Sequence, residues 1–209
     1  MKYARIFIGA FLAGLSIGLG GLAFLSVDNK VIGALFFTIG LFTVCTFDLN
    51  LFTGKICYVF DNGWDYAVNL PVIWAGNLVG TSFAALFATL TRNSADLSEK
   101  AYSLCTIKAK DSLLSLFFLG VLCNIFIYIA VEGFKNNPHG VGKYLSLIFG
   151  VTVFILTGTE HCVADMFYFQ IAHAWNGRAI ACILVITLGN CVGGVLFPLL
   201  RKLYLKKDD

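Results

Sequence analysis

The sequence predicts an all-α membrane protein with six transmembrane helices, arranged as an inverted repeat of three plus three. Three observations predict this fold. The chain of 209 residues is 58% hydrophobic and 13% charged, whereas soluble domains are about 45–50% apolar and about 25% charged. Six apolar runs approach the roughly 20 residues that cross the hydrocarbon core of a bilayer. Polar residues interrupt spans two and five, and paired broken helices are typical of transporters and channels.

The predicted spans form one integral membrane domain, residues 1–209. They are residues 5–25, 31–51, 68–90, 113–133, 144–169 and 178–200. The links are short except for residues 92–111, which divide the chain into repeats of about 1–92 and 111–201. The first span is long enough to cross the membrane, and no small-residue cleavage site follows it, so we expect no cleaved signal peptide.

The first half carries one polar break. Span one contains Gly14 and Gly18, small residues that allow helices to pack closely. Span two ends in the polar segment 48–55 (DLNLFTGK), where we expect the helix to be broken and Asn50 to have a structural role. Span three contains the segment 76–80, with the letters GNLVG.

The second half repeats these features. Span four contains Asn124, which we expect to form a hydrogen bond between helices. Span five is interrupted at residues 157–168 (TGTEHCVADMFY), where ionisable groups lie at membrane depth. Such groups are costly there and are usually kept for a function. Span six contains GNCVGG at 189–194, with Asn190 as a further interhelix hydrogen bonder. Because each half has three spans, the second half must be inverted.

Charge and composition exclude other classes of protein. The net charge of +3 is small and scattered, unlike the basic patch of a nucleic-acid-binding protein. No ATP-binding motif or cofactor fingerprint is present, so we expect no cofactor.

More Lys and Arg lie on the side that holds both termini, including the basic segment 201–207, so both termini are expected in the cytoplasm. We expect a plasma membrane or a bacterial inner membrane, with lipid around the chain.

His161 is the leading candidate for the functional site. Histidine exchanges protons near physiological pH, and Phe154, Gly158 and His161 share one helix face at i, i+4 and i+7. Thr53 lies in the other break, and its hydroxyl could donate to or accept from His161 or a permeant species. The alternatives are structural: the histidine could bond a neighbouring helix, and the threonine could cap the broken helix.

Four charged residues accompany this pair. Glu160 and Asp165 are expected to satisfy backbone groups at the break or to pair with other buried polar groups. His161 and Asp165 are four residues apart, but a metal site needs further ligands, so we expect none. Lys108 and Lys110 precede span four, where lysines either extend to the membrane surface or attract anions to a pore mouth.

Several segments together resemble the formate/nitrite transporter family. The most specific are residues 51–54 (LFTG) and 158–167 (GTEHCVADMF), supported by 76–80, 119–124 and 189–194. The resemblance covers nearly the whole chain. It implies an aquaporin-like six-helix protomer, a homopentamer, and one pore through each protomer.

The resemblance also implies roles for individual residues. His161 would be the central histidine of the family, Thr53 its partner, and Lys108 the lysine of the outer vestibule. The hydrophobic constrictions would include Phe37, Leu41, Leu51, Phe52 and Phe154.

The chain departs from the family pattern in three places. Asn50 stands where formate channels often have an acidic or small residue, with Asp48 two residues earlier. Asp165 stands where the family usually has asparagine. The sequence also starts almost at span one, so we do not expect gating by a cytoplasmic N-terminal helix.

These features predict transport of small monovalent anions of weak acids, such as formate, nitrite or hydrosulfide. His161 would protonate the anion or bind it through a charge-assisted hydrogen bond. A proton-coupled carrier of short monocarboxylates and a channel for ammonia or water are the alternatives. The lysines disfavour ammonium. An asparagine-proline-alanine motif would favour water, and the sequence contains none. A membrane enzyme with Glu160, His161 and Asp165 as acid–base groups would lack a nucleophile motif.

Overall fold

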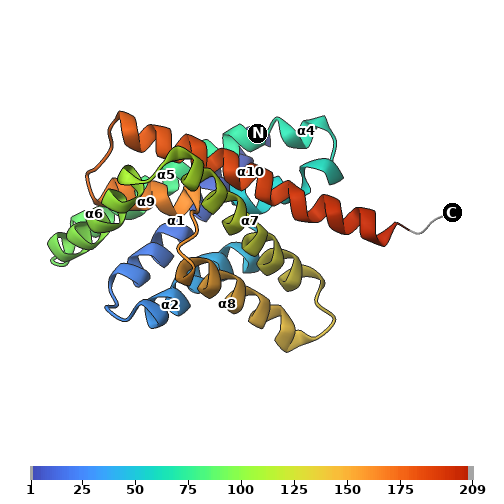
Figure 1. Cartoon of the computed structure of the whole chain (residues 1–209), viewed down its shortest axis with the longest axis horizontal. Helices are drawn as coiled ribbons and strands as arrows, with labels where there is room; N and C mark the ends of the chain where they lie inside the picture. Colours follow the sequence, from blue (N-terminus) through green and yellow to red (C-terminus); the bar gives the residue numbers. More distant parts are fainter. Residues whose placement is uncertain (1, 207–209) are drawn as a thin grey trace.

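The computed structural model describes residues 2–206, which form helices and no strand (Figure 1). The elements of the first half are α1 (Lys2–Leu25), α2 (Lys30–Thr46), α3 (Phe52–Lys55), the 3₁₀ helix η1 (Ile56–Asp61), α4 (Trp64–Ala67) and α5 (Leu70–Thr89). Those of the second half are α7 (Leu113–Asn136), α8 (Gly140–Leu156), α9 (Cys162–Ile171) and α10 (Gly177–Leu205). A further helix, α6 (Ser94–Lys110), joins the halves.

Four spans are long apolar helices and two are broken. Helices α1, α7 and α10 and the segment Trp64–Thr89 are long and apolar enough to cross a membrane. The remaining spans each consist of two helices in sequence. Helix α2 ends before α3 begins, and α8 ends before α9 begins. The predicted breaks in spans two and five are therefore confirmed.

The chain turns in the same way at both breaks. Asp48 has a φ of 47° and Gly158 has a φ of 69°, so both lie in the left-handed region. Glycine adopts this conformation freely, and aspartate is among the residues that tolerate it. Each turn ends one helix of a broken span and directs the chain back into the protein toward the next.

The two halves pack their helices in equivalent pairs. Helix α1 packs on α5 and α2, and α7 packs on α10 and α8. Glycines bring the long helices into backbone contact. A methyl group at Gly80 of α5 would collide with the Phe11 carbonyl of α1, and one at Gly193 of α10 would collide with the Val121 carbonyl of α7. The two segments that share the pattern GN-VG, residues 76–80 and 189–193, are therefore helix-packing sites in the two halves.

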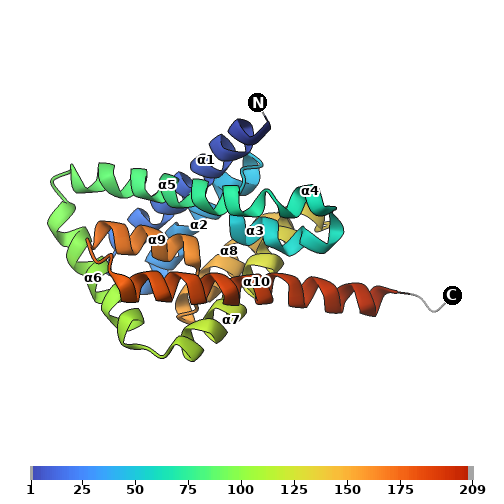
Figure 2. The ribbon, with the colours of Figure 1, turned by 90° about the horizontal axis from the view of Figure 1, so that it is seen from above.

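Helix α6 occupies most of residues 92–111, for which the sequence predicts only a link between the halves. It packs against α9, α5 and α10 at one end of the molecule (Figure 2). Its buried residues are Leu97, Ala101, Cys105 and Lys108, which lie on one helix face. This helical spacing was visible in the sequence, but the segment is too polar to be recognised as a span. The helix buries Lys108 within the protein.

Candidate functional site

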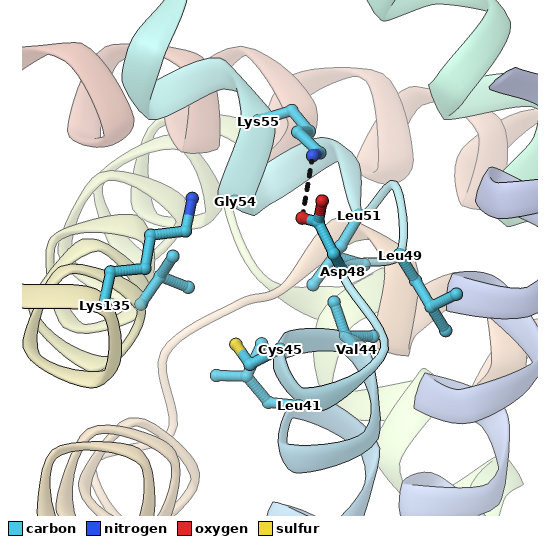
Figure 3. A pocket seen from close by; sticks show the side chains of 10 residues that line it. Leu41, Val44, Cys45, Asp48, Leu49, Leu51, Gly54, Lys55 and Lys135 are labelled. Carbon is cyan, nitrogen blue, oxygen red and sulfur yellow. Dashed lines mark ion pairs between the residues drawn. The ribbon is translucent and has the colours of Figure 1, made fainter. Parts of the chain in front are cut away.

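Two of the hollows in the described part of the chain are lined by residues of the broken spans. The His161 hollow is lined by Lys30, Phe37, Lys108, Phe154, Glu160, His161, Asp165 and Tyr168, among others. The Lys135 hollow is lined by Leu41, Val44, Cys45, Asp48, Leu49, Leu51, Gly54, Lys55, Val131 and Lys135 (Figure 3). The two sets of lining residues do not overlap.

His161 lines the His161 hollow and contacts Thr53, which is buried and is not among the lining residues. The Nε2 atom of His161 lies 2.8 Å from Oγ1 of Thr53, and both side chains are buried. The other ring nitrogen, Nδ1, accepts a hydrogen bond of 3.1 Å from the Ala164 N–H and so caps α9. Because Nδ1 accepts, the ring proton is assigned to Nε2, which donates to the Thr53 hydroxyl. The histidine therefore has both a capping role and a contact across the two breaks.

Asparagines hold the helix that carries Thr53. Oδ1 of Asn77 accepts the Phe52 N–H at 2.8 Å, and Nδ2 of Asn124 donates to the Thr53 carbonyl at 3.0 Å. Asn50 anchors the preceding loop to α1 by donating to the Ile6 carbonyl at 3.2 Å. Asn77 was not singled out as a site residue. The sequence feature that could have identified Asn77 is the GN-VG pattern, in which it occupies the same place as Asn190.

Asn190 holds the second broken helix. Its Oδ1 accepts the Cys162 N–H at 2.9 Å. Its Nδ2 donates to the carbonyls of Gly120 and Glu160, at 2.8 and 2.9 Å. These bonds satisfy backbone groups that the broken helix would otherwise leave unpaired in a buried place.

Apolar side chains separate the two hollows. Phe37 and Leu41 lie one turn apart on α2, and Phe37 lines the His161 hollow while Leu41 lines the Lys135 hollow. The rings of Phe37 and Phe154 meet edge to face, with centroids 5.8 Å apart. The Phe154 ring also stacks on His161 at 5.8 Å. Leu51 lines the Lys135 hollow.

Phe52 is placed differently from the other apolar site residues. It is buried but is not among the residues that line either hollow. Its described polar contact is the backbone N–H bond to Asn77. Phe52 therefore contributes to the core beside Thr53 rather than to the walls of the hollows.

Lys108 pairs with two carboxylates in the His161 hollow. Its Nζ atom contacts the carboxylate of Glu160 and lies 3.0 Å from Oδ1 of Asp165, and all three side chains are buried. Glu160 and Asp165 thus pair with a buried polar group, one of the two roles expected for them. Lys110 is exposed on α6 and is not among the lining residues of this hollow. The two lysines, which the sequence presented as a pair, have separate environments.

The Lys135 hollow carries two lysines that sequence reasoning did not identify. Figure 3 shows Lys55 directed at the Asp48 carboxylate, with Lys135 entering from the other side. The Lys55–Asp48 distance is 3.6 Å, and the aspartate is largely exposed. Nζ of Lys135 lies 4.5 Å from the centroid of the Tyr58 ring. The sequence feature that could have identified Lys55 as a site residue is its position two residues after Thr53. Among residues 2–206, no three His, Cys, Asp or Glu side chains gather into a possible metal site.

The sequence matches a family model over nearly its full length. The model is described as formate/nitrite transporter and matches residues 1–204. A nitrite transporter, NirC, of Salmonella typhimurium is 31% identical over 91% of this chain and 79% of its own length. A formate channel, FocB, of Escherichia coli is 24% identical over 97% of this chain and 88% of its own length.

Solved structures show the same fold. A pentameric formate channel with formate bound has a TM-score of 0.80 at 26% identity, covering 98% of both chains. An FNT family ion channel has a TM-score of 0.86 at 26% identity, covering 99% of this chain and 96% of the other. The likeness confirms the predicted aquaporin-like arrangement of six spans. With a family model that spans the helices of both halves, the chain belongs to the formate/nitrite transporter family.

Proposed function

We propose that this chain conducts small monovalent anions of weak acids, such as formate or nitrite, along a path that joins the two hollows. The observation that carries this proposal is the contact between Thr53 and His161, at the place where both broken helices meet. The names of the relatives, a nitrite transporter and a formate channel, support the same class of substrate. Membership of a transporter family decides against a membrane enzyme.

The physical task is to move an anion past an apolar constriction. The idealised cost of transferring such an ion into a low-dielectric medium is on the order of 20 kcal/mol, and several kcal/mol remain after relaxation. Lysines at each hollow lower the energy of an approaching anion. The Thr53 oxygen accepts from His161, so its hydroxyl proton is available to the anion. The pair thereby replaces part of the lost hydration at the constriction.

Protonation would remove most of the remaining cost. As the anion of a weak acid loses water, its pKa rises, and it can cross as the neutral acid. His161 in this geometry is a neutral hydrogen-bond donor, because its Nδ1 is occupied by the Ala164 N–H. We therefore assign the Thr53 hydroxyl, oriented by His161, to hydrogen bonding of the permeant species.

Assembly and placement follow from the same relatives. The pentameric formate channel is similar along the whole chain, which supports a homopentamer with one path in each protomer. Many large apolar side chains are exposed on the single chain and would face lipid or a neighbouring copy. The proposed location is a plasma membrane or a bacterial inner membrane, with both termini in the cytoplasm.

A proton-coupled carrier of short monocarboxylates would use the same residues. It differs from a channel in that the two hollows are never open together. A channel would pass many ions per opening and give a measurable single-channel current, whereas a carrier would not.

The test is anion flux into proteoliposomes, comparing formate, nitrite and hydrosulfide at about pH 5.5 and about pH 7.5. We expect flux that exceeds that of empty liposomes and rises at the acidic pH. The variant His161→Asn should lower the flux while the protein remains folded. Flux of all three anions at the level of empty liposomes would contradict the proposal and leave a neutral-solute channel as the next candidate.

A further inference from the structure

A buried cluster of one lysine and two carboxylates lines the His161 hollow. Lys108 extends from α6, Glu160 precedes α9, and Asp165 lies in its first turn. The ammonium group contacts both carboxylates, with Oδ1 of Asp165 at 3.0 Å. The side chains of Glu160 and Asp165 are 7% and 2% exposed, so water does little to screen them.

The charges of this cluster do not balance if both carboxylates are ionised. One ammonium group would then face two carboxylates and leave a net negative charge in the path of an anion. Two carboxylates that share a site bind one proton between them, because a single cation cannot neutralise both.

The surroundings assign this proton to Asp165. Its Oδ2 atom is buried and has no hydrogen-bond partner among residues 2–206. An ionised oxygen in that position would have no donor among these residues. The Lys108 ammonium contacts Oε2 of Glu160 and Oδ1 of Asp165, so Oδ2 of Asp165 is the carboxylate oxygen left without this donor.

Among residues 2–206, Lys108 is the cationic side chain that forms ion pairs with these carboxylates. Lys30, at the rim of the same hollow, donates to the Leu156 carbonyl at 3.4 Å, and Arg178 of α10 donates to backbone carbonyls at the end of α6. Helix α5 contains no titratable residue, and the charged residues of α1 lie in its first turn. The other titratable side chains around the cluster include Cys105, Cys123, His161, Cys162, Tyr168 and Cys182.

We propose that Asp165 holds an exchangeable proton and delivers it to the anion in the His161 hollow; this inference rests on the proposed function. The O–H bond of Asp165 breaks, and the proton moves to an oxygen or sulfur of the anion. The products are the neutral acid, which continues toward His161, and the Asp165 carboxylate, which pairs with Lys108. A proton from the bulk solution then reaches Asp165 through the same hollow and restores its O–H bond.

The sequence supports a role for this second carboxylate. The family resemblance places asparagine at this position, and an asparagine beside Lys108 and Glu160 would leave a neutral cluster with no proton to give. The capping bond on His161 Nδ1 also leaves the central histidine without a spare proton. Asp165 is therefore the group in this hollow that is placed to act as the donor.

Infrared spectroscopy tests the protonation directly. The C=O stretching band of a protonated carboxyl group should be present in the purified wild-type protein at about pH 7 and absent from Asp165→Asn. The control Asp48→Asn removes an exposed carboxylate and should leave the band unchanged. No band in the wild-type protein, or a band that persists in Asp165→Asn, would overturn the inference.

Flux measurements test the delivery step. In Asp165→Asn the ratio of formate flux at acidic pH to that at neutral pH should fall several-fold below the wild-type ratio. Asp165→Glu, which keeps a carboxyl group, should recover it. An unchanged ratio in Asp165→Asn, with normal flux, would overturn the delivery step alone. Absence of flux in the wild-type protein would instead overturn the proposed function, while the infrared result would still decide where the proton lies.

Discussion

Asn77 and Asn190 make the same three hydrogen bonds in the two halves of the chain. Each accepts the first N–H of a half-helix and donates to two carbonyls, one in the preceding loop and one in the neighbouring long helix. The partners correspond one to one, 110 residues apart: Ala10 and Gly120, Asn50 and Glu160, Phe52 and Cys162. The two breaks are therefore held by the same pattern of hydrogen bonds.

Replacing Asn190 by alanine should destabilise the protein. The change leaves the Cys162 N–H and the Glu160 carbonyl without these partners, whereas the Gly120 carbonyl keeps its bond within α7; each buried group left unpaired costs about 1–3 kcal/mol. The measurement is the free energy of unfolding in detergent micelles. Asn62→Ala is the matched control, because Asn62 is exposed and donates a single bond to the Tyr58 carbonyl. Equal stability of the two variants would show that the Asn190 bonds do not hold the break.

Removing the Thr53 hydroxyl should reduce anion flux without loss of folding. Thr53→Val keeps the shape of the side chain but removes the group that links His161 to the permeant species. A lost hydrogen bond of about 1.4 kcal/mol corresponds to about a tenfold decrease in rate. Thr53→Ser retains the hydroxyl and should retain most of the flux. If valine conducts as well as serine, the hydroxyl has no part in permeation.

Gly158→Ala should destabilise the second break through its backbone alone. Gly158 has a φ of 69°, and an added methyl group would meet no atom within 4 Å. The expected cost is therefore the left-handed conformation itself, about 1–2 kcal/mol. Gly177→Ala is the control, because that glycine also has open space but not this backbone conformation. Thermal unfolding of the two variants, measured side by side, isolates the cost of the left-handed backbone, and equal stability of the two would contradict the prediction.

Phe154→Ala should admit larger monocarboxylates. The Phe154 ring packs edge to face on Phe37 and stacks on His161, so its removal widens the apolar passage between the hollows. We expect the ratio of lactate flux to formate flux to increase. An unchanged ratio would place the selective constriction elsewhere, with Leu41 and Leu51 as the next candidates.

Lys135→Gln should weaken anion uptake from the side of the Lys135 hollow. The loss should be largest at low ionic strength, because salt screens the attraction between the lysine and an approaching anion. Flux from each side is measured with oriented protein at two salt concentrations. Lys110→Gln provides the control, since Lys110 is exposed and is not a lining residue of either hollow. A salt-independent effect would indicate a structural role for Lys135.

Much of this fold was predictable from the sequence, because a bilayer imposes simple requirements on length and polarity. The six spans, the two breaks and the repeat followed from apolar runs and from the GN-VG segments. The meeting of Thr53 and His161 was a hypothesis that depended on two breaks lying side by side, and the structure places the two atoms 2.8 Å apart.

The environment of Lys108 could not be predicted in the same way. Its burial depends on α6, whose polar sequence gave no span signal, and on the packing of that helix against α9. Sequence spacing also does not show which nitrogen of His161 caps α9. Both properties come from tertiary contacts between residues far apart in the chain.

The matched hydrogen bonds have a consequence for how such a protein can evolve. Leu51 and His161 occupy equivalent positions, each immediately before a half-helix that an asparagine holds in place. The repeat therefore contains two positions with the same backbone geometry, and a side chain can change at one of them while the other is kept. The His161 position can carry a polar group while the Leu51 position stays apolar. Substrate preference can therefore change through substitution at one of the two positions.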